Sequence, residues 1–284
     1  MKFKQYSYTS QQLGERIINI EQTFNAQEIN RALLCNVLSL LDLTTLNGTD
    51  NAAIVDNLCA KATSFAKLYH DCPNVAAVCV YPPFVNQAKK LLNNSGVAVA
   101  SVAGAFPSGQ SPIAVKVAEV AYCVEQGADE IDMVISRGTF LEGNFAEVSS
   151  EITAIKTACK QAHLKVILET GELQSVANIR KASELAILAG GDFIKTSTGK
   201  INPSATPEAM LIMCDTIKEY YEATGIKIGI KPAGGIADTK TALLYYAIVQ
   251  AILGKEWLTP GLFRIGASRL ADDLLTHIES IQPN

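Results

Sequence analysis

The chain has 284 residues, of which 48% are hydrophobic and 18% charged, and its 28 acidic and 24 basic side chains give a formal net charge of −4. This composition excludes an intrinsically disordered chain. The near balance of charge, without runs of lysine or arginine, argues against a nucleic acid or an anionic membrane as partner. No stretch has the roughly 20 apolar residues of a membrane-spanning helix, and the N-terminus lacks the apolar core of a signal peptide. We therefore expect a soluble, cytoplasmic protein.

Short apolar runs alternate with segments of helical period along most of the chain. Residues 1–36 precede the first run and predict one or two helices that cap the bottom of the domain. Most runs are continuous rather than alternating, which is typical of parallel strands covered on both faces. The runs predict eight strands, at residues 37–42, 75–81, 97–105, 130–135, 165–170, 192–197, 226–231 and 262–266.

Helix-boundary residues lie between these runs. Ser111-Pro112 and Thr206-Pro207 predict helix starts, and Gly190-Gly191 predicts a helix end. The predicted strands end 24 to 39 residues apart, which is one strand and one helix each time. This α/β pattern predicts a single (β/α)8 TIM barrel over residues 37–284 with an N-terminal helical extension over residues 1–36. An open doubly wound sheet is the rival, but no G-x-G-x-x-G follows the first strand.

The cysteines bear on the redox environment. They are scattered, odd in number and form no C-x-x-C pair, which is typical of reduced thiols in the cytosol. We expect all seven to be free: Cys35, Cys59, Cys72, Cys79, Cys123, Cys159 and Cys214.

Two lysines, Lys195 and Lys231, end neighbouring predicted strands, where the active site of a barrel lies. Each cation disfavours the charged form of the other, so one amine can lose its proton near neutral pH and attack a carbonyl. The alternative is a structural ion pair between each lysine and Asp132 or Glu169. That alternative suits one strand lysine better than two, because adjacent like charges destabilise a fold that does not need them.

A carboxylate, Asp132, interrupts the apolar run at residues 130–134. It is the best candidate for moving protons between carbon, water and nitrogen during imine chemistry. An ion pair between Asp132 and Lys231 is compatible with that role. Asp129 and Glu130, at the entry of the same run, are expected at the surface or on the bottom face.

Glycines predict an anion site at the same end of the barrel. Gly234-Gly235 and the segment 266–268 follow the last two strands, where barrels commonly bind phosphate on backbone N–H groups. Gly199 and Lys200 could reach the same anion. A simple tight turn is the alternative for the glycine pair.

Other chemistries have little support. His70, His163 and His277 fall at helix ends or between elements and form no ligand pair, so we expect no metal site and no cofactor. Cys79 ends a strand and could touch a ligand, although an inert buried thiol is the stronger interpretation.

Seven segments resemble the deoxyribose-phosphate aldolases, in order from the first strand to the last. The segments from strands six and seven are the most specific to that family. The matching residues are 42–46 (DLTTL), 79–82 (CVYP), 129–134 (DEIDMV), 165–173 (KVILETGEL), 192–200 (DFIKTSTGK), 231–235 (KPAGG) and 264–268 (RIGAS).

The resemblance implies a metal-independent class I aldolase that reversibly cleaves 2-deoxy-D-ribose 5-phosphate to acetaldehyde and D-glyceraldehyde 3-phosphate. It implies that Lys195 forms the Schiff base, that Lys231 lowers its pKa and that Asp132 relays protons through water. It further implies sugar-phosphate contacts at Thr198, Gly199, Lys200, Gly234, Gly235, Gly266 and Ser268, and a pocket lined by Asp42, Thr44, Cys79 and Lys165.

The sequence departs from the family at two points. Arg269 follows Ser268 where many relatives carry a second small hydroxyl residue, and it could either bind phosphate or point outward. The chain ends Ile281-Gln282-Pro283-Asn284, without the C-terminal tyrosine that some members bring to the active site.

Two other functions remain open. One is a different Schiff-base barrel lyase, such as a transaldolase-like enzyme with another sugar phosphate, and the other is a sugar-phosphate-binding barrel without turnover. The family resemblance also implies a homodimer or homotetramer.

Overall fold

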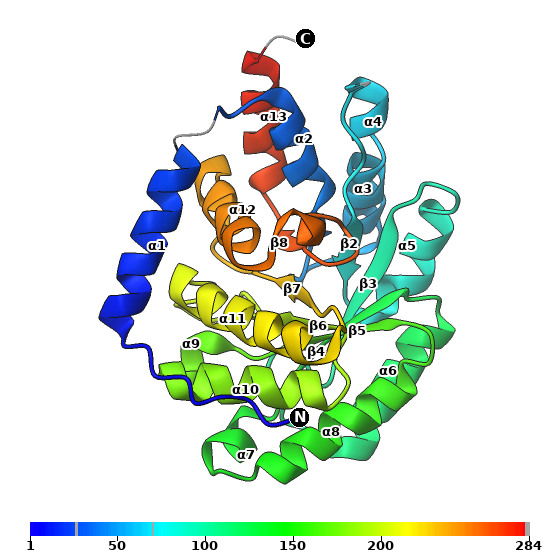
Figure 1. Cartoon of the computed structure of the whole chain (residues 1–284). Helices are drawn as coiled ribbons and strands as arrows, with labels where there is room; N and C mark the ends of the chain where they lie inside the picture. The colour runs from blue at the N-terminus through cyan, green and yellow to red at the C-terminus, as the bar shows by residue number, and fades with distance from the viewer. Residues whose placement is uncertain (26–27, 70, 282–284) are drawn as a thin grey trace.

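The computed structural model describes residues 1–25, 28–69 and 71–281. Within them, eight parallel strands form one sheet in the order β7-β6-β5-β4-β3-β2-β1-β8, with helices between them (Figure 1). The strands are β1 (Leu41–Thr44), β2 (Ala77–Val80), β3 (Ala98–Ala103), β4 (Glu130–Val134), β5 (His163–Ile167), β6 (Phe193–Lys195), β7 (Gly229–Lys231) and β8 (Ile265–Ala267).

The two outermost strands in this order close the sheet into a barrel. Ile230 on β7 bridges to Phe263, and Ala233 bridges to Gly266 on β8. Gly266 N–H donates to the Pro232 carbonyl at 2.9 Å. The predicted single (β/α)8 barrel is therefore confirmed.

The helices form the outer layer of the barrel. They are α1 (Ser10–Asn25), α2 (Arg31–Ser39), α3 (Ala52–Ala62), α4 (Phe65–Leu68), α5 (Val85–Leu91), α6 (Ile113–Glu125), α7 (Arg137–Leu141), α8 (Phe145–Ala158), α9 (Thr170–Leu173), α10 (Val176–Leu188), α11 (Pro207–Thr224), α12 (Thr239–Leu253) and α13 (Leu270–Ser280). Two 3-10 turns add η1 (Pro82–Phe84) and η2 (Lys255–Trp257). No helix of the described ranges is both long and apolar enough to cross a bilayer.

Helix boundaries follow the predicted signals with one exception. Thr206 caps α11 by accepting the N–H of Ala209 at 3.1 Å, and α10 ends just before the predicted glycine pair. At α6 the prediction is wrong by one position. Pro112 is itself the N-cap, and no side chain caps the helix there.

The first predicted strand, at residues 37–42, is partly wrong. Residues up to Ser39 belong to α2, and β1 begins only at Leu41. The Asn30 side chain caps α2 by accepting the N–H of Leu33, and Leu34, Val37 and Leu38 are buried. An apolar run of this length fits helix and strand alike, so capping by Asn30 and tertiary packing decide the boundary.

The N-terminal extension does not cap the barrel's bottom as predicted. Instead, α1 packs on the outside of the barrel against α11 and α12, and α2 packs against α13 (Figure 1). Arg16 on α1 forms a two-pronged ion pair with Asp215 on α11, at 2.6 and 2.8 Å. Tyr6 donates to the same carboxylate at 2.6 Å. Helix α1 is thus a second layer over α11 and α12.

The prediction that all seven cysteines are reduced is wrong for two of them. Cys35 on α2 and Cys72 before β2 form a disulfide, with Cα atoms 5.0 Å apart. They are 37 residues apart in the sequence, so no local spacing motif predicts this disulfide. The other five are buried free thiols.

Two further predictions concern residues near element ends. His163 begins β5 rather than lying between elements. His70 and the predicted tail segment 282–284 lie outside the described residues.

Candidate active site

The register of the sheet brings the predicted catalytic residues together. Lys195 on β6 lies opposite Lys231 on β7, and Asp132 on β4 lies opposite Lys165 on β5. Paired residues of parallel strands share a face, and here that face is the barrel interior. All four side chains are almost completely buried, at 0 to 3% exposure.

Asp132 joins the two lysines. Its Oδ2 accepts a hydrogen bond from the Nζ of Lys195 and from the Nζ of Lys231, each at 2.7 Å. Lys231 also donates to Asp42 on β1. The ion pair between Asp132 and Lys231 that the sequence allowed is therefore present, and the same carboxylate oxygen also lies beside Lys195. Glu169 pairs with neither lysine in the described contacts.

A second layer of charge lies beneath this group. Lys165 donates to Glu130, and Arg264 bridges Glu130 and Asp42 with 2.7 Å contacts to each. Glu130 is only 5% exposed, so its expected place at the surface is wrong, although it lies at the entry of β4 as expected. Strand alternation explains the error, because Glu130 and Asp132 are two residues apart and face the same interior.

The barrel interior thus holds four basic side chains against three carboxylates. Loss of one proton from a lysine makes this group neutral. Lys195 pairs with Asp132 alone, whereas Lys231 pairs with both Asp42 and Asp132. Burial, together with the Lys231 charge, lowers the pKa of Lys195 despite the attraction of Asp132.

The neighbouring groups, in contrast, have pKa values shifted so that they stay charged. The carboxylates of Asp132 and Asp42 overcome the effect of burial and raise the pKa of Lys231. Nearby lysines hold the pKa of Asp132 well below its usual range, although burial opposes them. Lys195 is therefore the amine most ready to act as a nucleophile, beside an ionised carboxylate and a charged ammonium.

Gly266 leaves room for this arrangement. A Cβ atom at that position would lie 3.1 Å from Lys231 Cε and 2.8 Å from Ala233 Cβ. A side chain on this part of β8 would push Lys231 away from Asp132. Gly266 thus has a packing reason to be glycine, and its contact with the sugar phosphate stays a prediction.

A cavity of about 300 Å³ opens above the lysine pair at the C-terminal ends of the strands. Beyond the predicted residues, it is also lined by Asn47, Ala237 and Arg269. Asp42, Asp132, Lys165 and Lys231 lie beneath its floor, so the predicted pocket-lining role of Asp42 and Lys165 is not what the structure shows. The predicted residues that do line it are Thr44, Lys195, Thr198, Gly199, Lys200, Gly234, Gly235, Gly266 and Ser268.

One side of the cavity suits an anion. Gly234 and Gly235 both have positive φ angles, of 84° and 78°, which non-glycine residues rarely adopt. Consecutive N–H groups in such a turn can surround an anion. Arg269 is among the residues that line this cavity. The Lys200 ammonium donates to the Leu46 carbonyl across the mouth.

Thr198 is hydrogen-bonded to Glu169. Its hydroxyl donates to Glu169 Oε2 at 2.5 Å and its N–H donates to Glu169 Oε1 at 3.2 Å. The Thr198 hydroxyl proton is therefore not available for a hydrogen bond to a substrate. Thr198 can contact a substrate only as part of the cavity wall. Sequence reasoning missed this link, although Glu169 at the end of a barrel strand was a visible signal.

Cys79 is buried beside the lysines and not on the cavity wall. Burial raises the pKa of its thiol to about 11, so it stays protonated. It packs in a small apolar cluster with Leu46, Ala100 and Val102 inside the barrel. This agrees with the inert thiol that the sequence favoured.

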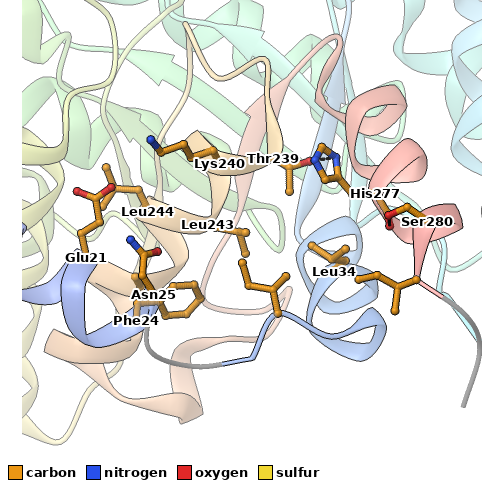
Figure 2. A pocket seen from close by; sticks show the side chains of 13 residues that line it. Glu21, Phe24, Asn25, Leu34, Thr239, Lys240, Leu243, Leu244, His277 and Ser280 are labelled. Carbon is orange, nitrogen blue, oxygen red and sulfur yellow. Dashed lines mark hydrogen bonds between the residues drawn. The ribbon is translucent and has the colours of Figure 1, made fainter.

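A separate cavity of about 200 Å³ lies between α1, α2, α12 and α13, outside the barrel. Figure 2 shows Phe24, Leu34 and Leu243 among its apolar walls, with His277 near Thr239 at one end. It contains none of the predicted site residues. The described residues include one group of possible metal ligands, Cys35, Asp71 and Cys72, but its two sulfurs form the disulfide.

Comparison with known proteins gives concordant matches. Residues 36–269 match the family described as DeoC/LacD family aldolase. The chain is 45% identical to the mouse (Mus musculus) deoxyribose-phosphate aldolase and 43% to the human one, each over 258 residues that cover 87% of this chain and 81% of the relative. It also resembles a solved deoxyribose phosphate aldolase from Aeropyrum pernix, described as tetrameric, with 26% identity, a TM-score of 0.72 and coverage of 93% of this chain and 98% of that one.

Proposed function

Because the chain belongs to the DeoC/LacD family of aldolases, we propose that it cleaves 2-deoxy-D-ribose 5-phosphate reversibly to acetaldehyde and D-glyceraldehyde 3-phosphate. The observation that carries the proposal is the state of Lys195. It is a buried amine of lowered pKa that lines the mouth cavity and touches Asp132. Such an amine can form an imine with an aldehyde.

In the proposed reaction, Lys195 Nζ attacks C1 of the open-chain sugar, and the carbinolamine takes up one proton from solvent and loses water, which gives a protonated imine. The C3 hydroxyl then loses its proton and the C2–C3 bond breaks, with its electron pair moving into the imine as an enamine. Glyceraldehyde 3-phosphate departs. Protonation at C2 and addition of water release acetaldehyde and restore the amine.

Asp132 is the group best placed to move these protons. Its Oδ1 is buried, lies 3.3 Å from the Lys165 ammonium and accepts no hydrogen bond within the described residues, so a lone pair remains for a water molecule. Because its pKa is held low, the carboxylate accepts a proton only transiently and passes it on. Lys231 stays charged beside it and, together with burial, lowers the pKa of Lys195.

The sugar phosphate fits the opposite wall of the cavity. There, Gly234 and Gly235 offer backbone N–H groups, and Ser268 and Arg269 add a hydroxyl and a guanidinium. The mouth cavity joins this wall to Lys195. One phosphorylated chain of five carbons can therefore place its aldehyde on the amine and its phosphate on the glycine turn.

The test is a coupled assay for glyceraldehyde 3-phosphate, run with the purified protein, 2-deoxyribose 5-phosphate and a panel of other phosphosugars, with and without a chelator. We expect cleavage of the deoxy sugar, release of acetaldehyde and no effect of the chelator. Cleavage of another phosphosugar in preference would favour a different Schiff-base lyase. Binding without acetaldehyde release would favour a non-catalytic barrel.

Arg269 gives a prediction about phosphate affinity. We expect Arg269→Ser to raise KM for the phosphorylated sugar about tenfold with little change in kcat, because a guanidinium-to-phosphate hydrogen bond is lost in the ground and transition states alike. Steady-state kinetics measure the effect, and Arg269→Lys, which keeps the charge, serves as the control. An unchanged KM in Arg269→Ser would show that the side chain does not bind phosphate.

The proposal includes a homo-oligomer and a cytoplasmic location. The Aeropyrum pernix relative is described as tetrameric, and light scattering on the purified chain measures the oligomeric state directly. Five buried free thiols suit a reducing compartment, and the Cys35–Cys72 disulfide is the feature that argues against one.

A further inference from the structure

Glu169 has an unusual place at the mouth of the barrel. It follows β5 directly, its side chain is fully buried, and its backbone is left-handed with φ of 56° and ψ of 59°. Residues other than glycine adopt this conformation only when their surroundings enforce it, and such positions cluster at functional sites. Burial also raises the pKa of this carboxyl.

The side chain of Glu169 continues the pairing of β5 with β6 past the end of the strands. The main chain provides the last regular links, from Leu168 N–H to the Lys195 carbonyl and from Thr170 N–H to the Thr196 carbonyl, both at 2.9 Å. Beyond Thr196, the acceptor is the Glu169 carboxylate instead of a main-chain carbonyl, and it accepts hydrogen bonds from both the N–H and the hydroxyl of Thr198. The segment that follows the reacting lysine is thereby fixed to β5.

This link extends in both directions around the mouth. On one side, Arg137 donates to Glu169 Oε2 at 3.1 Å and to the carbonyls of Pro107 and Ser108 at 3.0 and 2.7 Å. On the other side, Thr198 Oγ1 accepts the N–H of Lys200 at 3.1 Å. Lys200 Nζ then donates to Leu46 after β1. One chain of hydrogen bonds therefore connects the loops after β3, β4, β5, β6 and β1.

We propose that Glu169 is a positioning residue, whose buried carboxylate holds Thr198 and, through it, the Gly199–Lys200 wall where the sugar phosphate binds. The inference rests on the proposed function, since it concerns the same cavity. Glu169 does not line that cavity and acts only through Thr198. Its removal should therefore weaken phosphate binding and leave the amine chemistry at Lys195 unchanged.

The test compares Glu169→Ala with the wild-type chain in two measurements. We expect KM for 2-deoxyribose 5-phosphate to rise about tenfold or more, because two hydrogen bonds to a charged acceptor are lost, and kcat to stay within about threefold. The second measurement is the rate at which acetaldehyde and borohydride label Lys195, read by intact mass. Acetaldehyde carries no phosphate, so this rate should stay within about twofold of wild type.

Glu172→Ala is the matched control. Glu172 also pairs with Arg137, at 2.8 Å, but it is half-exposed and makes no described contact with Thr198. We expect the wild-type KM for this variant. Glu169→Gln keeps one acceptor for Thr198 and should fall between wild type and alanine, and it serves as the test variant should the alanine variant fail to fold.

The outcomes separate the two proposals. An unchanged KM in both Glu169 variants, or an equal loss of sugar cleavage and acetaldehyde labelling, would overturn the positioning role. A wild-type chain that releases no acetaldehyde from the sugar would instead overturn the proposed function.

Discussion

Lys195→Leu is expected to abolish cleavage of the sugar phosphate, lowering kcat by at least about four orders of magnitude. No other amine can replace it in the described site. Lys231 is only 1% exposed, lies beneath the cavity floor and is paired with two carboxylates. Lys200 lines the cavity but is tied to the Leu46 carbonyl. Without an imine, the C2–C3 bond has no electron sink.

The measurement that assigns the nucleophile is borohydride trapping with acetaldehyde. The wild-type chain should gain the mass of one ethyl group, and peptide mapping should locate it on Lys195. Lys200→Met is the control. Lys200 lines the same cavity but is not expected to react, so this variant should still be labelled on Lys195. A labelled Lys195→Leu variant, or an adduct on another lysine in the wild-type chain, would refute the mechanism.

Lys231→Leu is expected to shift the pH dependence of the reaction to higher pH. The two lysine Nζ atoms bind the same Asp132 oxygen, each at 2.7 Å, so the Lys231 charge opposes protonation of Lys195. Two like charges roughly 5 Å apart at an effective dielectric of about 20 repel by about 3 kcal/mol, or about two pK units. Removing Lys231 therefore raises the pKa of Lys195, and less neutral amine is present at pH 7.

The quantity to measure is kcat/KM against pH. Its rising limb should move by one to two units towards alkaline pH, with a loss of about 10- to 100-fold at pH 7, since each pK unit reduces the neutral fraction about tenfold. Lys231→Arg keeps the positive charge, so its rising limb should stay near that of wild type even if turnover falls. A limb that stays in place or moves towards acid in Lys231→Leu would contradict the electrostatic role.

Much of the architecture and of the reacting group is readable in the sequence. The eight apolar runs predict the barrel because each is short, buried on both faces and followed by a helix. Lys195, Lys231 and Asp132 are visible because charged side chains are rare in such runs. The start of β1 was not predictable, since residues 31–42 fit a helix equally well until the Asn30 cap and the packing of α2 are known.

The interactions that support the site were harder to predict. Glu130 looked like a surface residue after Asp129, and only the two-residue alternation with Asp132 indicates that it faces Arg264 and Lys165. The left-handed turn at Glu169 depends on contacts with Arg137 and Thr198, about 30 residues away on either side, so no local pattern reports it.

The position of α1 has a consequence for local unfolding. The helix lies beside α11 and α12 (Figure 1). It binds α11 through the Arg16–Asp215 ion pair, and its Phe24 ring lies 6.1 Å from the Tyr246 ring of α12. These two helices follow the strands that carry Lys195 and Lys231. Neither can open alone while α1 is in place, so their amide hydrogens should exchange through one shared opening. We therefore expect β6 and β7, which carry Lys195 and Lys231, to belong to a single cooperative unit that is joined by a segment from the far end of the sequence.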